Sequence, residues 1–194
     1  MQISEEVKKV LLLAARDAIK SLFGKGNSTQ IDYSQYPELT EKNKGAFVTL
    51  TMHHELRGCI GYLEAPNQTL LETISGAAKR AAFNDPRFHP LSAQELPDVN
   101  IEISILSSFS SINEYDEIQI GIHGLLLDEK GRQALLLPQV ATEHNFNLQQ
   151  FLTAICQKAG IESYSWQKRK LNLKVFTAIV FSESEKKKKS YDTA

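Results

Sequence analysis

Segments with strand periodicity come in consecutive pairs along this chain. Ala46–Met52 alternates apolar and polar side chains, and Leu56–Leu63 follows after a short polar connection. Alternation on both sides of a short connection predicts an antiparallel hairpin. The runs Leu125–Leu127 and Leu135–Leu137 flank Gly131 in the same way and predict a second hairpin. Paired strands favour an α+β fold over a doubly wound parallel sheet.

Three further segments are predicted to be strands. Val99–Ile105 alternates isoleucine or valine with polar residues, which is typical of a strand with one apolar face. Ile118–Ile122 has a shorter alternation, and Leu173–Phe181 is predicted as the last strand. The expected fold is therefore α+β, with an antiparallel or mixed sheet and flanking helices.

Helices are predicted between the hairpins, where apolar residues recur every three or four positions. Each has an N-cap residue at its start and a glycine or a proline-directed stop at its end. The caps are Ser4, Thr69 and Asn147, and the ends lie near Gly24, Asn84 and Gly160. Ser92 to Glu95 has the pattern of a capping box on a single turn, and residues 25–44 are predicted to be a loop.

Composition excludes several classes of protein. Lys and Arg total 22 against 23 Asp and Glu, so the basic surplus of a nucleic-acid-binding protein is absent. Two cysteines in 194 residues do not make a disulfide framework. The sequence has no signal-peptide pattern at its start and no apolar run of membrane-spanning length. We expect a cytoplasmic protein without membrane or nucleic-acid partners. Both cysteines are expected to be reduced, with Cys156 in the protein core on the packed face of a helix.

The densest candidate for chemistry is Leu56-Arg57-Gly58-Cys59-Ile60-Gly61. Strand alternation places Arg57 and Cys59 on one face, about 6.5 Å apart, where Gly61 leaves space. A cation at that distance favours a thiolate, so Cys59 is a candidate reactive cysteine. Gly58 and Gly61 indicate a bulge or the close approach of a ligand or another segment. The alternative is that Cys59 is a small buried apolar residue.

Two other polar features are candidates for the same site. Asp85-Pro86-Arg87 ends a predicted helix, and its simpler interpretation is a turn that stops that helix. Glu102 lies on the polar face of the strand Val99–Ile105. The simpler interpretation is that this face of the sheet is exposed to solvent. Sequential strands are neighbours about two-thirds of the time, so we expect this strand to pair beside Leu56–Leu63. Glu102 is then expected to approach a guanidinium of Arg57 or Arg87.

Metal and cofactor motifs are absent. The chain has no His-x-x-x-His or Cys-x-x-Cys pair, no P-loop, no dinucleotide-binding glycine pattern and no Gly-x-Ser-x-Gly. No metal and no cofactor are therefore expected. Residues 183–194, which include Lys186 to Lys189, are predicted to be a charged, flexible tail.

Taken in order along the chain, these segments resemble the AMMECR domain family. The resemblance is carried by the hexapeptide 56–61 and by Asp85-Pro86-Arg87-Phe88, with Glu95-Leu96-Pro97 leading into Ile101-Glu102-Ile103-Ser104. Leu135-Leu136-Leu137-Pro138-Gln139-Val140-Ala141 and Cys156-Gln157-Lys158-Ala159-Gly160 resemble the family's C-terminal half. The sequence departs from many relatives at His89 and at the His53-His54 turn, so a Cys–His pair would not be a family-wide device.

The resemblance implies one domain over residues 1–182, with a larger lobe that holds both termini and a smaller inserted lobe. It also implies two partners, a Memo-like protein and a radical S-adenosylmethionine protein, which together with such a chain form the AmmeMemoRadiSam system. No reaction is established for the family, so the resemblance does not supply one.

Two classes of function remain open. The first is a small-molecule or modification-related site, with Cys59 as nucleophile or covalent acceptor and Glu102 as base. Its ligand-binding residues are Arg57, Gly58, Gly61, Asp85 and Arg87. The second class is a non-catalytic module that receives a partner protein with the same residues.

Overall fold

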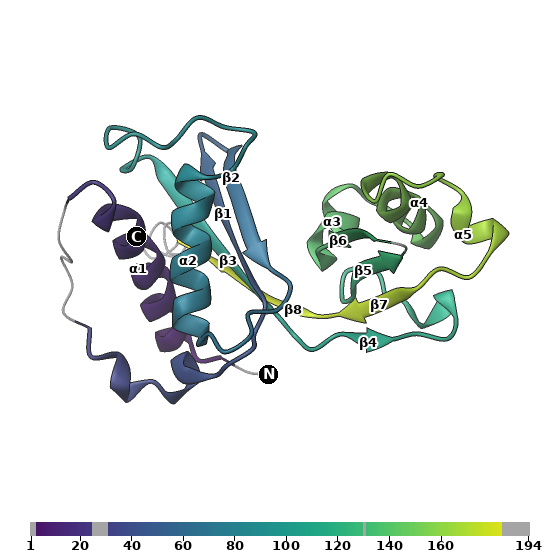
Figure 1. The fold of residues 1–194 in the computed structure, drawn as a ribbon, viewed down its shortest axis with the longest axis horizontal. Helices are drawn as coiled ribbons and strands as arrows, with labels where there is room; N and C mark the ends of the chain where they lie inside the picture. Colours follow the sequence, from purple (N-terminus) through teal and green to yellow (C-terminus); the bar gives the residue numbers. More distant parts are fainter. Residues whose placement is uncertain (1–2, 25–30, 130, 184–194) are drawn as a thin grey trace, which may run out of the picture. The chain divides into compact units, whose positions relative to one another are not determined.

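The computed structural model describes residues 3–24, 31–129 and 131–183 of the chain. These residues form two compact units, each with its own sheet (Figure 1). Unit 1 spans Met1–Leu106 and Ile179–Ala194, and unit 2 spans Ser107–Ala178. In the sequence, unit 2 therefore lies between the two segments of unit 1.

The sheet of unit 1 has the strand order β2-β1-β3-β8. Its strands are β1 (Ala46–Met52), β2 (Glu55–Tyr62), β3 (Val99–Leu106) and β8 (Ala178–Ser182). β1 is antiparallel to both β2 and β3, so the first predicted hairpin is confirmed. β2 is an edge strand of this sheet, and β1 lies between it and β3.

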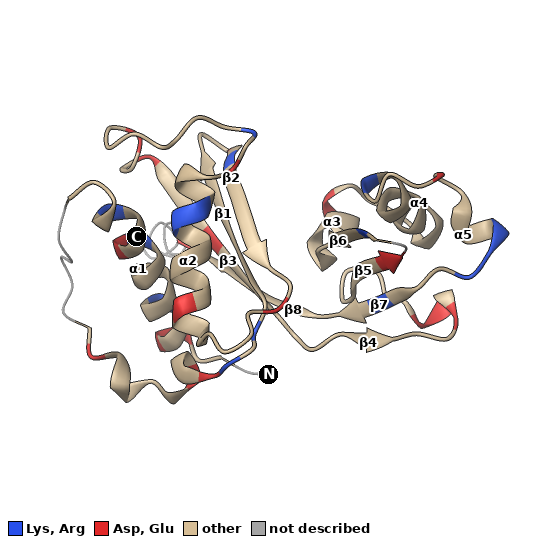
Figure 2. Cartoon of the chain, in the orientation of Figure 1, with Lys and Arg blue, Asp and Glu red and all other residues tan. Residues whose placement is uncertain are grey.

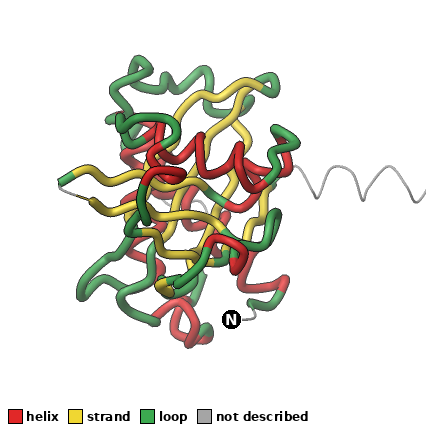
Figure 3. Tube along the Cα trace, turned by 90° about the vertical axis from the view of Figure 1, so that its right-hand side faces the viewer, coloured by secondary structure: helices red, strands yellow, loops and turns green. Residues whose placement is uncertain are grey.

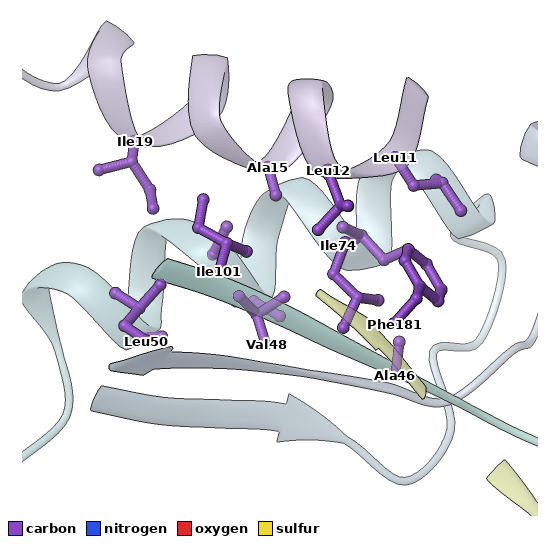
Figure 4. Close-up of a cluster of buried hydrophobic side chains, with 14 of the residues drawn as sticks. Leu11, Leu12, Ala15, Ile19, Ala46, Val48, Leu50, Ile74, Ile101 and Phe181 are labelled. Atoms are coloured by element: carbon purple, nitrogen blue, oxygen red, sulfur yellow. The ribbon is translucent and has the colours of Figure 1, made fainter. Parts of the chain in front are cut away.

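Two helices cover one face of the unit 1 sheet. α1 (Glu5–Ser21) starts at Ser4, whose side chain accepts from the Val7 backbone N–H, and α2 (Leu70–Phe83) starts at Thr69 with a complete capping box. Figure 4 shows the core between these helices and the sheet, where Leu12 and Ile19 of α1 face Val48 and Leu50 of β1. All four side chains are nearly or fully buried. Burial of this apolar layer holds α1 and α2 to the sheet.

Unit 2 has a second antiparallel sheet with the order β4-β7-β5-β6. Its strands are β4 (Ser110–Ser111), β5 (Gly124–Glu129), β6 (Arg132–Leu136) and β7 (Leu173–Phe176). Its helices are α3 (Pro138–Glu143), α4 (Leu148–Lys158) and α5 (Ser165–Lys168). Figure 3 distinguishes these helices and strands from the loops by colour. The second predicted hairpin, β5 with β6, is confirmed.

The structure corrects two predicted strands. The segment Ile118–Ile122 is not a strand: it follows a 3-10 turn at Tyr115–Glu117, and Gly121 has a φ of 81°. Ile118 is buried, whereas Ile122 is 53% exposed, so the alternation reflects a turn with one anchoring side chain. The predicted last strand is two strands, β7 and β8, in different sheets. The break falls at Thr177, which exchanges hydrogen bonds with Ser107.

The loop predicted for residues 25–44 contains two short 3-10 helices, Tyr33–Gln35 and Pro37–Thr40, and residues 25–30 lie outside the described residues. Of the predicted tail, only Glu183 is described. Its carboxylate accepts from the Arg16 side chain and from the Ile101 backbone N–H. Within the described ranges, no helix combines the length and the apolar character needed to cross a membrane.

The fold class predicted from the sequence, α+β with antiparallel sheets and flanking helices, is confirmed.

Candidate functional site

Asp85 and Arg87 hold the main chain of Cys59 from the outer edge of the unit 1 sheet. The Cys59 N–H donates to Asp85 Oδ2 at 2.8 Å, and Arg87 Nη2 donates to the Cys59 carbonyl oxygen at 3.3 Å. The two side chains are paired with each other, through Arg87 Nε to Asp85 Oδ1 at 3.0 Å and Nη2 to Oδ2 at 2.7 Å. We call these three residues the edge clasp.

The position of β2 explains why this clasp forms. β2 pairs with β1 on one side only. Every second residue of β2 therefore directs its backbone N–H and C=O away from β1, towards the open edge of the sheet. Cys59 is one of these residues, and Asp85 and Arg87 supply the acceptor and the donor that a neighbouring strand would offer. α2 ends at Asn84, which delivers Asp85-Pro86-Arg87 to this edge. The edge clasp therefore supplies hydrogen-bond partners to the backbone of one residue on the exposed edge strand.

The edge clasp strongly stabilises the ionised form of the Asp85 carboxyl group. The Asp85 side chain is 2% exposed, whereas that of Arg87 is 54% exposed. Hydrogen bonds from Arg87, together with those from the Cys59 and Arg87 backbone N–H groups, hold the pKa of Asp85 far below its usual range. The same pairing raises the pKa of Arg87. Asp85 is therefore an anion at any physiological pH.

Arg57 is held by a different carboxylate, that of Glu95. Arg57 Nε donates to Glu95 Oε1 at 2.8 Å and Nη2 to Oε2 at 3.3 Å, and Nη1 donates to the His89 carbonyl oxygen at 3.0 Å. The bond from Arg57, aided by the Ser92 N–H, lowers the pKa of Glu95 to about 2. The predicted Ser92–Glu95 capping pattern is present as a turn and fixes the carboxylate that orients Arg57.

Arg57 is the extra residue of a β-bulge in β2. Gly58 is opposite Leu50 and Leu56 is opposite Thr51, so Arg57 has no partner on β1. The extra residue of the bulge moves Leu56 to the face of Thr51, where it is 42% exposed.

A pocket of ≈530 Å³ lies between these two arginines. Its lining combines both guanidiniums with one carboxylate, a histidine and apolar rings; the residues are Arg57, Pro86, Arg87, Phe88, His89, Pro90 and Glu95. Arg87 also lies over the Phe88 ring, with 5.4 Å between the guanidinium carbon and the ring centroid. Each of the two cations is paired with a carboxylate, Arg57 with Glu95 and Arg87 with Asp85.

The side chain of Cys59 lies on the face of the unit 1 sheet away from α1 and α2. Its Sγ is 3.3 Å from the Thr49 hydroxyl oxygen, and either atom can donate. Cys59 is half-buried and is free, as is the buried Cys156 of unit 2. Burial raises the pKa of the Cys156 thiol.

Glu102 lies in line with Thr49 and Cys59 across the unit 1 sheet. β3 pairs with β1, so the expectation that its strand lies beside that of Cys59 is wrong. Thr49 is opposite Cys59 on one side and opposite Glu102 on the other, which separates their Cα atoms by about 10 Å. The hydrogen bonds of Arg57 and Arg87 go to Glu95 and Asp85 instead.

The two glycines of the motif are packed against protein atoms. A Cβ at Gly58 would lie 2.2 Å from the Ala81 carbonyl oxygen of α2, and one at Gly61 would lie 2.4 Å from the Phe47 ring. The space expected beside Gly61 is therefore occupied by Phe47. Of the alternatives left open for these glycines, the structure shows both a bulge, next to Gly58, and close approach by another segment.

Sequence reasoning missed Thr49 and Glu95. Thr49 is one of the two alternating threonines of β1, and only the strand register identifies it as the neighbour of Cys59. Glu95 was visible as part of a capping box, but its second role with Arg57 depends on the tertiary fold. Among the described residues, no cluster of three or more His, Cys, Asp or Glu side chains is arranged to hold a metal ion.

Comparisons with known proteins give a consistent result. The AMMECR1 family model matches residues 12–181. A protein of Sulfolobus acidocaldarius is 38% identical over 95% of this chain and 85% of its own length. A protein of Methanosarcina mazei is 35% identical over 94% of both chains.

A solved structure has the same fold. An uncharacterized protein of Pyrococcus horikoshii matches with a TM-score of 0.84 and 32% identity, over 94% of each chain. The sequence motifs, the fold and these matches agree, and the chain belongs to the AMMECR1 family.

Proposed function

We propose that this protein binds a small anionic molecule in the pocket beside the edge clasp, with Cys59 as the nucleophile or covalent acceptor of the site. The observation that carries the proposal is the state of Arg87. Its Nε and Nη2 are engaged by Asp85 and Cys59, while its Nη1 makes no hydrogen bond with the described residues. A guanidinium that is oriented by a buried carboxylate and keeps a free edge is well suited to bind carboxylate or phosphate oxygens.

Arg57 supplies the second cation of the site. Its side chain is 14% exposed and is fixed by Glu95, so it offers a positioned charge at little further entropy cost. Gly58 and Gly61 serve the site through packing, because they let β2 lie close to α2 and to the Phe47 ring.

Cys59 gives the site its chemistry. Its backbone is held by the clasp on one side of β2, and its thiol contacts the Thr49 hydroxyl. Thr49 lies between Cys59 and Glu102 across the sheet. In this proposal Glu102 is the base, and it accepts the proton of the Cys59 thiol by way of the Thr49 hydroxyl. The proposal places the protein in the cytoplasm, where thiols are kept reduced.

Binding of inorganic phosphate and of succinate tests the proposal. We expect each anion to shift the NMR resonances of the Arg87 and Arg57 side chains in a saturable way. The Arg87→Gln variant should lose this response, and Arg80→Gln should keep it, because Arg80 does not line the pocket. Saturable binding that is unchanged in Arg87→Gln, or no response to either anion, would favour the alternative of a non-catalytic interaction module.

Membership of the family supports a further part of this proposal. A Memo-like protein and a radical S-adenosylmethionine protein are the partners with which this chain acts. Co-expression of the tagged chain with each of these proteins from the same genome should yield a complex on affinity purification. Recovery of neither partner would contradict this part while leaving the anion site to its own test.

A further inference from the structure

We propose that unit 2 carries a second ligand site, between α4 and α5, for an uncharged heterocycle of the nucleobase class. The site is a pocket of ≈360 Å³ formed by the outer face of α4, the residues before it and α5. Apart from Ala154, its lining consists of amide, hydroxyl and aromatic side chains, from Phe146, Asn147, Gln149, Gln150, Thr153, Gln157, Tyr164, Trp166 and Gln167. All of these residues lie within unit 2, so the site is independent of the function proposed for unit 1.

The lining contains no charged side chain, which restricts the charge of the ligand. Outer faces of surface helices usually carry Lys, Glu or Arg. The one charged residue of α4 is Lys158 at its last position, and Figure 2 shows most of this helix in tan. A charged ligand would lose water here without gaining an opposite charge, so the pocket favours a neutral one.

The amide groups offer both donors and acceptors to such a ligand. Asn147 and Gln150 use their carbonyl oxygens in the capping box of α4, which leaves their –NH₂ groups as donors. Gln157 donates through Nε2 to Ser163 Oγ, which leaves its carbonyl oxygen as acceptor. The side chains of Gln149 and Gln167 make no hydrogen bond with the described residues.

The aromatic side chains add a fixed wall and an exposed ring. Trp166 Nε1 donates to Thr153 Oγ1 at 3.1 Å, and the Tyr115 ring packs edge-on against the indole with 6.4 Å between centroids. These contacts hold the indole in place. Tyr164 is 54% exposed, with no ring partner among the described residues, although burial of tyrosine rings is favourable.

Nucleobases match this combination of groups. Asn and Gln side chains form paired hydrogen bonds with adenine, and aromatic side chains stack on unpaired bases. The pocket volume lies near the lower end of ordinary ligand pockets, which suits a base or nucleoside better than a larger molecule. Because no cation lines the pocket, a phosphate on the ligand should not improve binding.

Trp166 is the one tryptophan of the chain, so its fluorescence reports on this pocket directly. We expect adenosine to quench this fluorescence in a saturable way in the full-length protein, and AMP to bind no more tightly. Tyr164→Ala should weaken adenosine binding about tenfold, through loss of a stacking surface. The matched control is Gln133→Ala, an exposed glutamine of β6 outside the pocket, which should leave the affinity unchanged.

Three results would overturn the proposal. They are the absence of saturable quenching up to the solubility limit of adenosine, equal affinity in Tyr164→Ala, and saturable quenching by glucose in place of adenosine. Thermal unfolding of both variants confirms that they are folded, which is expected because both replaced side chains are exposed.

Discussion

The Asp85 carboxylate accepts a hydrogen bond from the backbone N–H of Cys59 at 2.8 Å, across 26 residues of chain. This contact joins the end of α2 to the edge strand of the unit 1 sheet at the residue whose thiol is the candidate nucleophile. The backbone of Cys59 is thereby fixed from outside the sheet, while its side chain lies against Thr49.

Replacement of Asp85 should destabilise the protein more than replacement of an exposed acid. In Asp85→Ala the Cys59 N–H loses its acceptor and Arg87 loses its carboxylate, so we expect the free energy of unfolding to fall by about 3 kcal/mol. Asp85→Asn keeps an acceptor for Cys59 and should cost about half as much. Urea unfolding measures both changes, with exposed Asp116→Ala as control. Equal stability of all three variants would show that the clasp contributes nothing to the fold.

The Arg57–Glu95 pair predicts a specific acid sensitivity. The pKa of Glu95 is about 2 in the folded protein, against 4.5 for an unperturbed glutamate, so its ionised form favours folding. This stabilisation is present above pH 4.5 and is lost as the pH falls towards about 2. Glu95→Gln should therefore show a shallower loss of stability over this range than the parent. Urea midpoints measured against pH test this, and exposed Glu55→Gln should follow the parent curve.

The tip of the β1–β2 hairpin is strained, so a better turn should stabilise the protein. His53 and His54 both have positive φ, 52° and 68°, which is the geometry of a type I′ turn. Asn-Gly is the preferred pair for this turn, and L-residues in the left-handed region cost roughly 1–2 kcal/mol. The double change His53→Asn, His54→Gly should raise the free energy of unfolding by about 1 kcal/mol. A thermal midpoint at or below that of the parent would contradict the strain.

Two glycines form a matched pair with opposite predictions. In Gly58→Ala the new Cβ would meet the Ala81 carbonyl oxygen at 2.2 Å, so α2 and β2 must separate, at a cost of about 2 kcal/mol. In Gly76→Ala the nearest atom is the Tyr62 hydroxyl oxygen at 3.5 Å, and the helix gains about 0.5–1 kcal/mol. Chemical denaturation should rank them in this order on either side of the parent. A neutral Gly58→Ala would show that the close approach is not required.

The sequence predicted the elements well where local chemistry decides them. The caps at Ser4, Thr69 and Asn147 define helix starts that the structure confirms, because the cap and the first turn are neighbours in the chain. Ile118–Ile122 was wrong because a short alternation also fits a turn with one buried anchor, here Ile118.

The site was harder to predict because it depends on strand order and register. Placement of Glu102 beside the Cys59 strand assumed that strands adjacent in sequence pair, whereas β1 takes the central position. The bulge at Arg57 also breaks the alternation from which its direction was inferred. Arg57, Asp85 and Arg87 were predicted to belong to one site; the structure pairs Arg87 with Asp85, but it pairs Arg57 with Glu95.

The central claim is that Arg87 and Arg57 draw an anion to Cys59. The most direct test is the ratio of Cys59 alkylation rates with iodoacetate, an anion, and iodoacetamide, its neutral analogue, measured by mass spectrometry of the Cys59 peptide. The same ratio in urea-unfolded protein is the internal reference. We predict that the iodoacetate-to-iodoacetamide ratio is several-fold higher in the folded protein than in urea, with an increase of about tenfold as the upper range for one oriented charge. In Arg87→Gln the ratio should return towards the urea value. A folded ratio equal to or below the unfolded one, or one that Arg87→Gln leaves unchanged, would contradict the account.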